Sequence, residues 1–260
     1  MDLVTWLNRI DDALGCVVHV GAGAGSILES YAALPTAQRP RKLVLIEGDP
    51  EAARSLERAA APYASVQVLP TPVAAHSGPM VWNRFSLRTL NGPLDASALT
   101  SIYPRLRRTQ TTTLHCEAIA DVLTTLDLAS SENERLVNAL VFDVPGQESL
   151  LLAAMPPALL RQFQAVLLRG CRIPLPPNGH VAAAAQERLL QRHFAAATQQ
   201  EHDDALWPEV LMRFDATGYE LSHLRQQVAR LEAALKESNR AAQELESVTQ
   251  AKAAAEKLAA

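Results

Sequence analysis

Three glycines and one acid have the residue types and the spacing of a nucleoside-binding turn. Gly21, Gly23 and Gly25 lie in the run G-A-G-A-G, between an apolar strand-like stretch and a helix-like stretch. Glycine lets the backbone turn tightly and lets a ligand approach, and the following helix presents unpaired N–H groups. Glu47 ends the next strand-like stretch, about twenty residues on, where a carboxylate can accept hydrogen bonds from both hydroxyls of a ribose. These four residues therefore predict a site for a ligand that contains a ribose.

Each of these residues also has an explanation that needs no ligand. A glycine turn can serve close packing alone, and an acid at a strand end can simply be solvated. The third small residue of a dinucleotide fingerprint would fall at Ser26 and not at Gly25, so a nicotinamide-dependent oxidoreductase is a distant alternative. No G-x-x-x-x-G-K-[ST] motif is present, which excludes a phosphate-binding P-loop.

Four segments resemble, in order, the motifs of FkbM-type class I S-adenosylmethionine-dependent methyltransferases. They are V-H-V-G-A-G-A-G from Val18, L-I-E-G-D-P from Leu45, V-A-A-H-S-G from Val73 and L-V-F-D-V-P-G-Q-E from Leu140. The resemblance implies a Rossmann-like fold with S-adenosylmethionine as the methyl donor. It also implies transfer to a hydroxyl of a glycan or a similar small molecule.

The same segments depart from the family pattern at charged positions. His19 stands where the family usually has an acid, Ala75 where it has Asp, and Pro145 where it has Glu. Val141 replaces the usual Lys, and Arg169 follows the fifth strand where members often carry an acid. The alternative function is therefore a catalytically degenerate methyltransferase-like domain that acts as a binding or scaffolding module.

Three side chains are candidate catalytic residues. Asp143 ends the fourth predicted strand, Glu148 lies at the same sheet edge, and His76 lies in the loop after the third strand. A base assists transfer to a hydroxyl, whereas the sulfonium of the donor is already activated. Glu148 can equally be a first-turn helix acid, and His76 an exposed loop residue. The candidate donor-binding residues are Gly21, Gly23, Gly25, Glu47 and Asp143.

Two further clusters carry weaker signals. Arg105, Arg107 and Arg108 could hold a phosphorylated or acidic acceptor, although a solvated loop explains them more simply. Residues 202–204 (H-D-D) are consecutive, and consecutive side chains rarely converge on one ion. We therefore predict no metal site.

The composition is that of an ordinary soluble globular protein, with 48% apolar and 20% charged residues in a chain of 260. A net charge of -4 excludes a global positive field that would hold nucleic acid or an anionic membrane. The three cysteines lie far apart, the N-terminus does not resemble a signal peptide, and no apolar stretch reaches the ~18 residues of a membrane span. We expect a cytoplasmic protein with no nucleic-acid partner and no membrane span.

Residues 1–216 alternate between apolar runs and amphipathic stretches, and this alternation predicts an α/β, doubly wound Rossmann-like sheet with helices on both faces. The predicted strands are 16–20, 43–46, 66–69, 136–142 and 163–168, the predicted helices are 4–14, 26–34 and 50–61, and the predicted antiparallel pair is 192–200 with 209–214. Residues 76–93 are predicted to form a hairpin or loop excursion. We expect the segment 76–115 and the residues after Arg169 to line the acceptor pocket.

Residues 217–260 are predicted to form a coiled-coil helix. From Leu221 to Leu245 the stripe positions alternate at spacings of three and four, which brings one stripe of the helix to face a partner. Self-association is predicted from this pattern, and Glu220 and Arg225 can pair if the helices form a parallel dimer. Most other flanking positions are Ala, Gln or Asn, which leaves the number of strands open, and a single unpartnered helix is the alternative. The last four residues, K-L-A-A, resemble a vector-derived tail, so we expect a truncated coiled coil.

Overall fold

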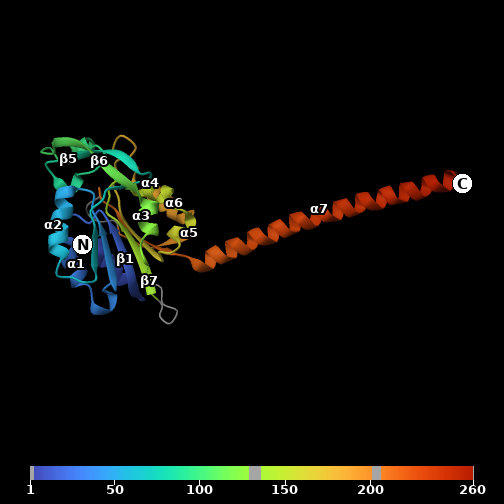
Figure 1. Cartoon of the computed structure of the whole chain (residues 1–260), viewed down its shortest axis with the longest axis horizontal. Coiled ribbons are helices and arrows are strands. Elements are labelled where there is room, and N and C mark those ends of the chain that lie inside the picture. The colour runs from blue at the N-terminus through green and yellow to red at the C-terminus, as the bar shows by residue number, and fades with distance from the viewer. Residues whose placement is uncertain (1–2, 129–135, 201–205, 260) are drawn as a thin grey trace. The chain divides into compact units, whose positions relative to one another are not determined.

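Seven strands form one sheet in the order β3-β2-β1-β7-β8-β10-β9. The structure is a computed structural model that describes residues 3–128, 136–200 and 206–259 (Figure 1). Neighbouring strands from β3 to β8 are parallel, and β10 is antiparallel to both β8 and β9. The strands are β1 (Ala13–Val20), β2 (Lys42–Ile46), β3 (Val66–Leu69), β7 (Leu136–Phe142), β8 (Ala165–Arg169), β9 (Phe194–Gln200) and β10 (Glu209–Phe214).

Helices cover both faces of this sheet, as the sequence predicts (Figure 1). One face packs against η1 (Leu3–Arg9), α1 (Ile27–Ala33) and α2 (Pro50–Ala60), and the short η2 (Thr36–Gln38) follows α1. The other face packs against α3 (Ile119–Thr124), α4 (Glu148–Ala154), α5 (Pro157–Leu160) and α6 (Ala182–Leu190). The central strands are nearly continuous apolar runs because both of their faces are buried. The predicted Rossmann-like α/β sheet is therefore confirmed.

Most of the predicted strands agree with the structure to within a few residues, and β3 and β7 have the predicted bounds. The antiparallel pair that closes the sheet is also confirmed, as β9 and β10. The prediction of a helix over residues 4–14 is wrong, because η1 ends at Arg9 and β1 already begins at Ala13. Ala13 and Leu14 pair with the start of β7, so strand pairing overrides the local helical spacing.

The predicted excursion is larger than a hairpin or loop over residues 76–93. β4 (Val73–Ala74), β5 (Gly78–Phe85) and β6 (Arg108–Ala118) form a second sheet in the order β4-β6-β5, and η3 (Arg88–Leu90) and η4 (Ala96–Leu99) lie between β5 and β6. The β5–β6 excursion, residues 78–115, has its own apolar core, in which Phe85 and Leu99 pack with Cys171. β6 is not recognisable in the sequence because most of its side chains are polar and exposed.

The chain divides into two compact units, Met1–Phe214 and Asp215–Ala260. The second unit consists of one helix, α7 (Ala216–Ala259), as predicted for this part of the chain. Its stripe residues Leu221, Leu224, Val228, Leu231 and Leu235 are between 47% and 70% exposed. Among the described residues, no helix combines the length and the apolar character that a membrane span requires.

Candidate functional site

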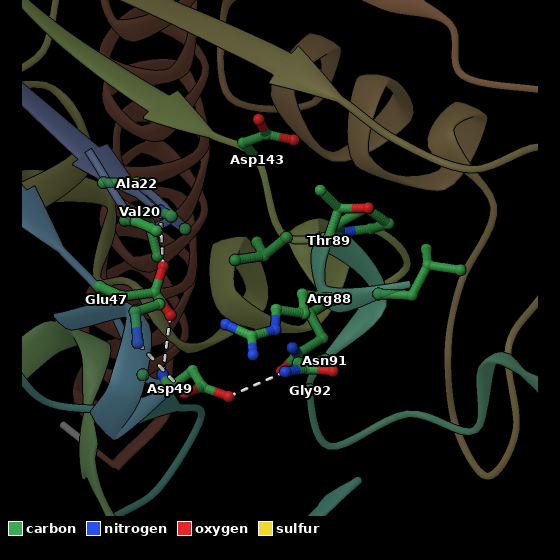
Figure 2. Close-up of a pocket in the computed structure, with 18 of the residues that line it drawn as sticks. Val20, Ala22, Glu47, Asp49, Arg88, Thr89, Asn91, Gly92 and Asp143 are labelled. Carbon is green, nitrogen blue, oxygen red and sulfur yellow. Dashed lines mark hydrogen bonds between the residues drawn. The ribbon is translucent and has the colours of Figure 1, made fainter. Parts of the chain in front are cut away.

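A cleft of about 980 Å³ opens at the carboxyl ends of β1, β2, β7 and β8, next to the β5–β6 excursion. This volume is at the upper end of the range of small-molecule sites. Gly23 of the glycine turn lines it. Glu47 and Asp143 line it beside the strand ends, and Arg88 and Asn91 line it from the excursion (Figure 2). The carboxyl ends of parallel strands are where open α/β sheets bind ligands. The sheet therefore brings most of the predicted donor-binding residues to one place.

The three glycines of the turn serve different purposes. All three have a positive φ: 87° at Gly21, 70° at Gly23 and 121° at Gly25. A Cβ at Gly21 would collide with the backbone carbonyl of Asp143, and one at Gly25 would lie 2.9 Å from Ala59 Cβ. A Cβ at Gly23 would meet no atom within 4 Å. Gly21 and Gly25 therefore allow close packing, whereas Gly23 leaves open space at the cleft.

Glu47 ties the glycine turn to the start of α2. Its Oε2 accepts a hydrogen bond of 2.6 Å from the N–H of Gly23, and its Oε1 accepts one of 2.7 Å from the N–H of Asp49 (Figure 2). The residue is only 8% exposed. Burial raises the pKa of Glu47, and hydrogen bonds from the backbone of Asp49, Gly23 and Gly48 offset part of that rise. Because a carboxylate has about four acceptor sites, these bonds still leave capacity for a ligand hydroxyl.

Asp49 is a site residue that the sequence analysis missed. Its Oδ1 accepts from the N–H groups of Glu51 and Ala52, and this caps α2. Asn91 of the excursion donates to its Oδ2 at 2.9 Å, and Arg84 lies 3.4 Å from its Oδ1. Burial alone would raise the pKa of Asp49, but these donors hold it below its ordinary value. The dipeptide Asp-Pro before a helical stretch was the signal that could have revealed the cap.

Asp143 follows β7 and lines the cleft, as predicted. Its Oδ2 forms an ion pair of 2.9 Å with Arg169, the cation noted as a departure from the family pattern. Arg169 also contacts the buried Glu209 at 2.8 Å, and Glu209 accepts a hydrogen bond from the indole of Trp6. A charge-assisted hydrogen bond of this kind fixes the position of the carboxylate. The surroundings of Asp143 therefore suit a role in orienting a ligand.

The other two candidate catalytic residues do not line the cleft. Glu148 begins α4, is 1% exposed, and accepts a hydrogen bond of 2.9 Å from the N–H of Gly146. Burial raises the pKa of Glu148 well above its ordinary value, which favours the neutral form. His76 is exposed in the bend between β4 and β5. The geometry thus supports a catalytic role for neither, because one side chain turns into the core and the other into solvent.

His19 lies on β1 and is fully buried. Its Nδ1 lies 3.0 Å from the hydroxyl of Tyr31, while its Nε2 has no hydrogen-bond partner among the described residues. Burial and the nearby charge of Arg169 lower the pKa of His19 to about 3. His19, which stands where the FkbM-type family usually has an acid, is therefore neutral at physiological pH and points into the core.

The excursion and the segment before β10 supply further lining residues. Leu87, Arg88 and Tyr103 line the cleft from the excursion, and Trp207 lines it from beyond β9. The indole N–H of Trp207 donates to the hydroxyl of Tyr103 at 3.0 Å. No motif in the sequence marks these residues individually. The described residues contain no group of three or more side chains that could hold a metal ion, and the H-D-D run at 202–204 lies outside them.

No protein-family model matches the chain, and no curated protein matches it. Solved structures with a similar fold include ribosomal protein L11 methylase from Lactobacillus delbrueckii subsp. bulgaricus, with 11% identity, a TM-score of 0.44, and coverage of 82% of this chain and 77% of that one. TrmK from M. capricolum in complex with S-adenosyl-homocysteine has 4% identity, a TM-score of 0.40, and coverage of 82% and 67%. Sp1610 from Streptococcus pneumoniae in complex with S-adenosyl-L-methionine has 8% identity, a TM-score of 0.42, and coverage of 81% and 71%.

The chain has an α/β Rossmann-like fold with a mostly parallel sheet, in which β1 lies beside β7 and β10 is inserted antiparallel next to β8. The resemblance to class I methyltransferases, including the FkbM-type family, stays a prediction.

Proposed function

We propose that this protein transfers a methyl group from S-adenosylmethionine to a hydroxyl of a saccharide or a similar small molecule. The observation that carries the proposal is the contact between Gly23 and Glu47 at the wall of the cleft. Gly23 leaves open space where a side chain would stand, and Glu47 presents unused acceptor capacity beside it. This combination suits the ribose of an adenosine.

The donor, when bound, supplies a methyl group on an already activated sulfonium. Glu47 and the backbone around Gly23 would hold its ribose, and Asp143 lies across the turn, where its carboxylate can orient the ligands. The protein's main contribution to such a reaction is alignment of the acceptor in a site that excludes water. The excursion serves this purpose because its residues form the wall opposite the glycine turn.

Calorimetry with S-adenosylmethionine tests the proposal. The unchanged protein should bind the donor, and Glu47→Ala should abolish binding, because it removes the acceptor for the ribose and the partner of Gly23. Glu57→Ala, a change of an exposed acid on α2, is the matched control and should bind as the unchanged protein does. Absence of donor binding by the unchanged protein would overturn the methyltransferase proposal and favour the scaffolding alternative.

We also propose that α7 associates with a second copy of the chain as a parallel coiled coil. The exposed stripe from Leu221 to Leu245 is apolar at most of its positions, which favours burial against a partner helix. In a parallel pair, Glu220 of one copy lies opposite Arg225 of the other. An antiparallel pair that matches the same leucines would bring the two Glu232 side chains together, so charge complementarity favours the parallel arrangement.

A further inference from the structure

The β5–β6 excursion carries a local positive charge in an acidic protein. Residues 78–115 contain five arginines and one acid, a net charge of +4, whereas the whole chain has a net charge of -4. The rest of the chain is therefore at -8. Such an asymmetry, placed beside a cleft, attracts anions to that cleft and repels them from other parts of the surface.

Two of the five arginines are neutralised by acids. Arg84 forms ion pairs with Asp49 and Glu51, and Arg108 forms one with Asp95. The remaining three arginines are exposed, and within the part of the chain that the structure describes they have no ion pair and no side-chain hydrogen bond. These three are Arg88, Arg105 and Arg107.

The three unpaired arginines line two depressions that adjoin each other. A shallow groove on the excursion is lined by Arg105, Arg107, Leu87 and Tyr103, and the last two of these residues also line the cleft. Arg88 follows Leu87 and lies inside the cleft, on the side that faces Glu47 and Asp49 (Figure 2). The groove and the cleft therefore adjoin at Leu87 and Tyr103.

We infer that the acceptor is a small molecule that carries a phosphate group, held in this groove by Arg105 and Arg107. The guanidinium group binds phosphate oxygens with charge-assisted, often bidentate, hydrogen bonds. The remainder of the molecule extends past Leu87 and Tyr103, so that its hydroxyl reaches the cleft. This inference rests on the proposed function, because it names the class of the methyl acceptor.

Charge favours a small phosphorylated acceptor over a polynucleotide. A long polyanion gains affinity by contacting many cations along its length, and such proteins present an extended basic surface. Here the basic region is confined to the excursion, and the rest of the chain is acidic. A single phosphate group needs only the arginines that line the groove.

Tryptophan fluorescence of the full chain can report occupation of the groove. Trp207 donates its hydrogen bond to Tyr103, which lies where the groove joins the cleft. The probes are glucose, glucose 6-phosphate and inorganic phosphate, with calorimetry as a second readout. Glucose 6-phosphate should bind about tenfold or more tightly than glucose, because its phosphate would accept charge-assisted hydrogen bonds from the arginines.

The variant Arg105→Gln/Arg107→Gln should lose about tenfold or more of this affinity. Arg54→Gln/Arg58→Gln removes the same charge from exposed positions on α2 that line neither depression, and it should bind as the unchanged protein does. Equal binding of glucose and glucose 6-phosphate, or binding that survives the Arg105/Arg107 change, would overturn the inference. Tighter binding of a single-stranded 12-nucleotide DNA through the same arginines would also overturn it, in favour of a polynucleotide.

Calorimetry with S-adenosylmethionine on the same samples separates this inference from the proposed function. Donor binding without discrimination between the two sugars would refute the phosphate site and leave the methyltransferase proposal standing. Discrimination without donor binding would keep the phosphate site and refute methyl transfer.

Discussion

Two buried carboxyls near the cleft show how the environment of a residue decides its chemistry. Glu47 accepts N–H groups from two different elements and borders open space. Glu148 accepts the N–H of Gly146 in its own turn and lies within the influence of the negative charge of Asp143. Glu47 can therefore bind a ligand, whereas Glu148 stays neutral and stabilises the turn after β7.

Glu148 should make the stability of the protein depend on pH. Its pKa is raised well above the ordinary 4.5, so the folded state favours the protonated form. The stability that the neutral carboxyl contributes is present below about pH 4.5 and is lost as the pH rises toward the folded-state pKa. Glu148→Gln keeps an uncharged group in place, so its free energy of unfolding relative to the unchanged protein should rise between about pH 5 and pH 8, by about 1 kcal/mol or more.

Urea unfolding at both pH values measures this difference. Glu57→Gln, at an exposed position on α2, is the control and should show no such change with pH. A constant difference between Glu148→Gln and the unchanged protein across this range would show that Glu148 is already ionised in the folded protein.

At the scale of elements, the start of α2 connects the sheet, the glycine turn and the excursion. Asp49 caps the helix, binds Asn91 and pairs with Arg84, so one carboxylate connects the start of α2 to the excursion. α1 differs from α2 in this respect. Ser26 stands at its N-cap position, as predicted, but its side chain makes no capping hydrogen bond.

This difference predicts unequal effects of two cap substitutions. Asp49→Ala should lower the free energy of unfolding by about 1–2 kcal/mol, because it removes the cap of α2 and leaves Asn91 without its acceptor. Ser26→Ala should change it by less than about 0.5 kcal/mol, because no capping bond is lost. Urea unfolding followed by tryptophan fluorescence measures both, since Trp6, Trp82 and Trp207 all lie in the first unit. Equal effects would contradict the assignment of Asp49 as the cap.

At the scale of the whole molecule, the two units differ in whether they bury their own apolar residues. The unit Met1–Phe214 buries its apolar residues within itself, around both faces of one sheet. The unit Asp215–Ala260 leaves its apolar stripe exposed, with Leu231 at 70% and Leu245 at 69%. In proteins, a helix gains most of its stability from packing its apolar face against other elements. This is the physical reason for proposing a partner helix for the second unit.

Light scattering on the full chain tests the proposed dimer. The unchanged protein should have twice the mass of the 28.2 kDa chain. Leu224→Asp/Leu231→Asp places charges in the apolar seam and should give the mass of one chain. Ala229→Asp/Ala233→Asp places the same charges outside the stripe and should leave the dimer intact. A single-chain mass for the unchanged protein would refute the association.

Local patterns in the sequence were enough to predict the sheet strands, the glycine turn and the long helix. The bounds of β3 and β7 were predicted to the residue. β7 is an almost wholly apolar run because it is buried on both faces, whereas the edge strand β3 is only partly buried and contains the exposed Gln67. The turn at Gly21 and Gly23, and the acid at Glu47, followed from their positions between such runs.

The direction of each side chain, and its partners, were decided only by the tertiary structure. Asp143 meets Arg169 across 26 residues of chain, and Asp49 meets Asn91 across 42. Glu148 turns into the core although it lies at the predicted sheet edge. Hydrophobic periodicity is a property of neighbours along the chain, whereas ion pairs, burial of single polar groups and the walls of a cleft arise between segments that only folding brings together.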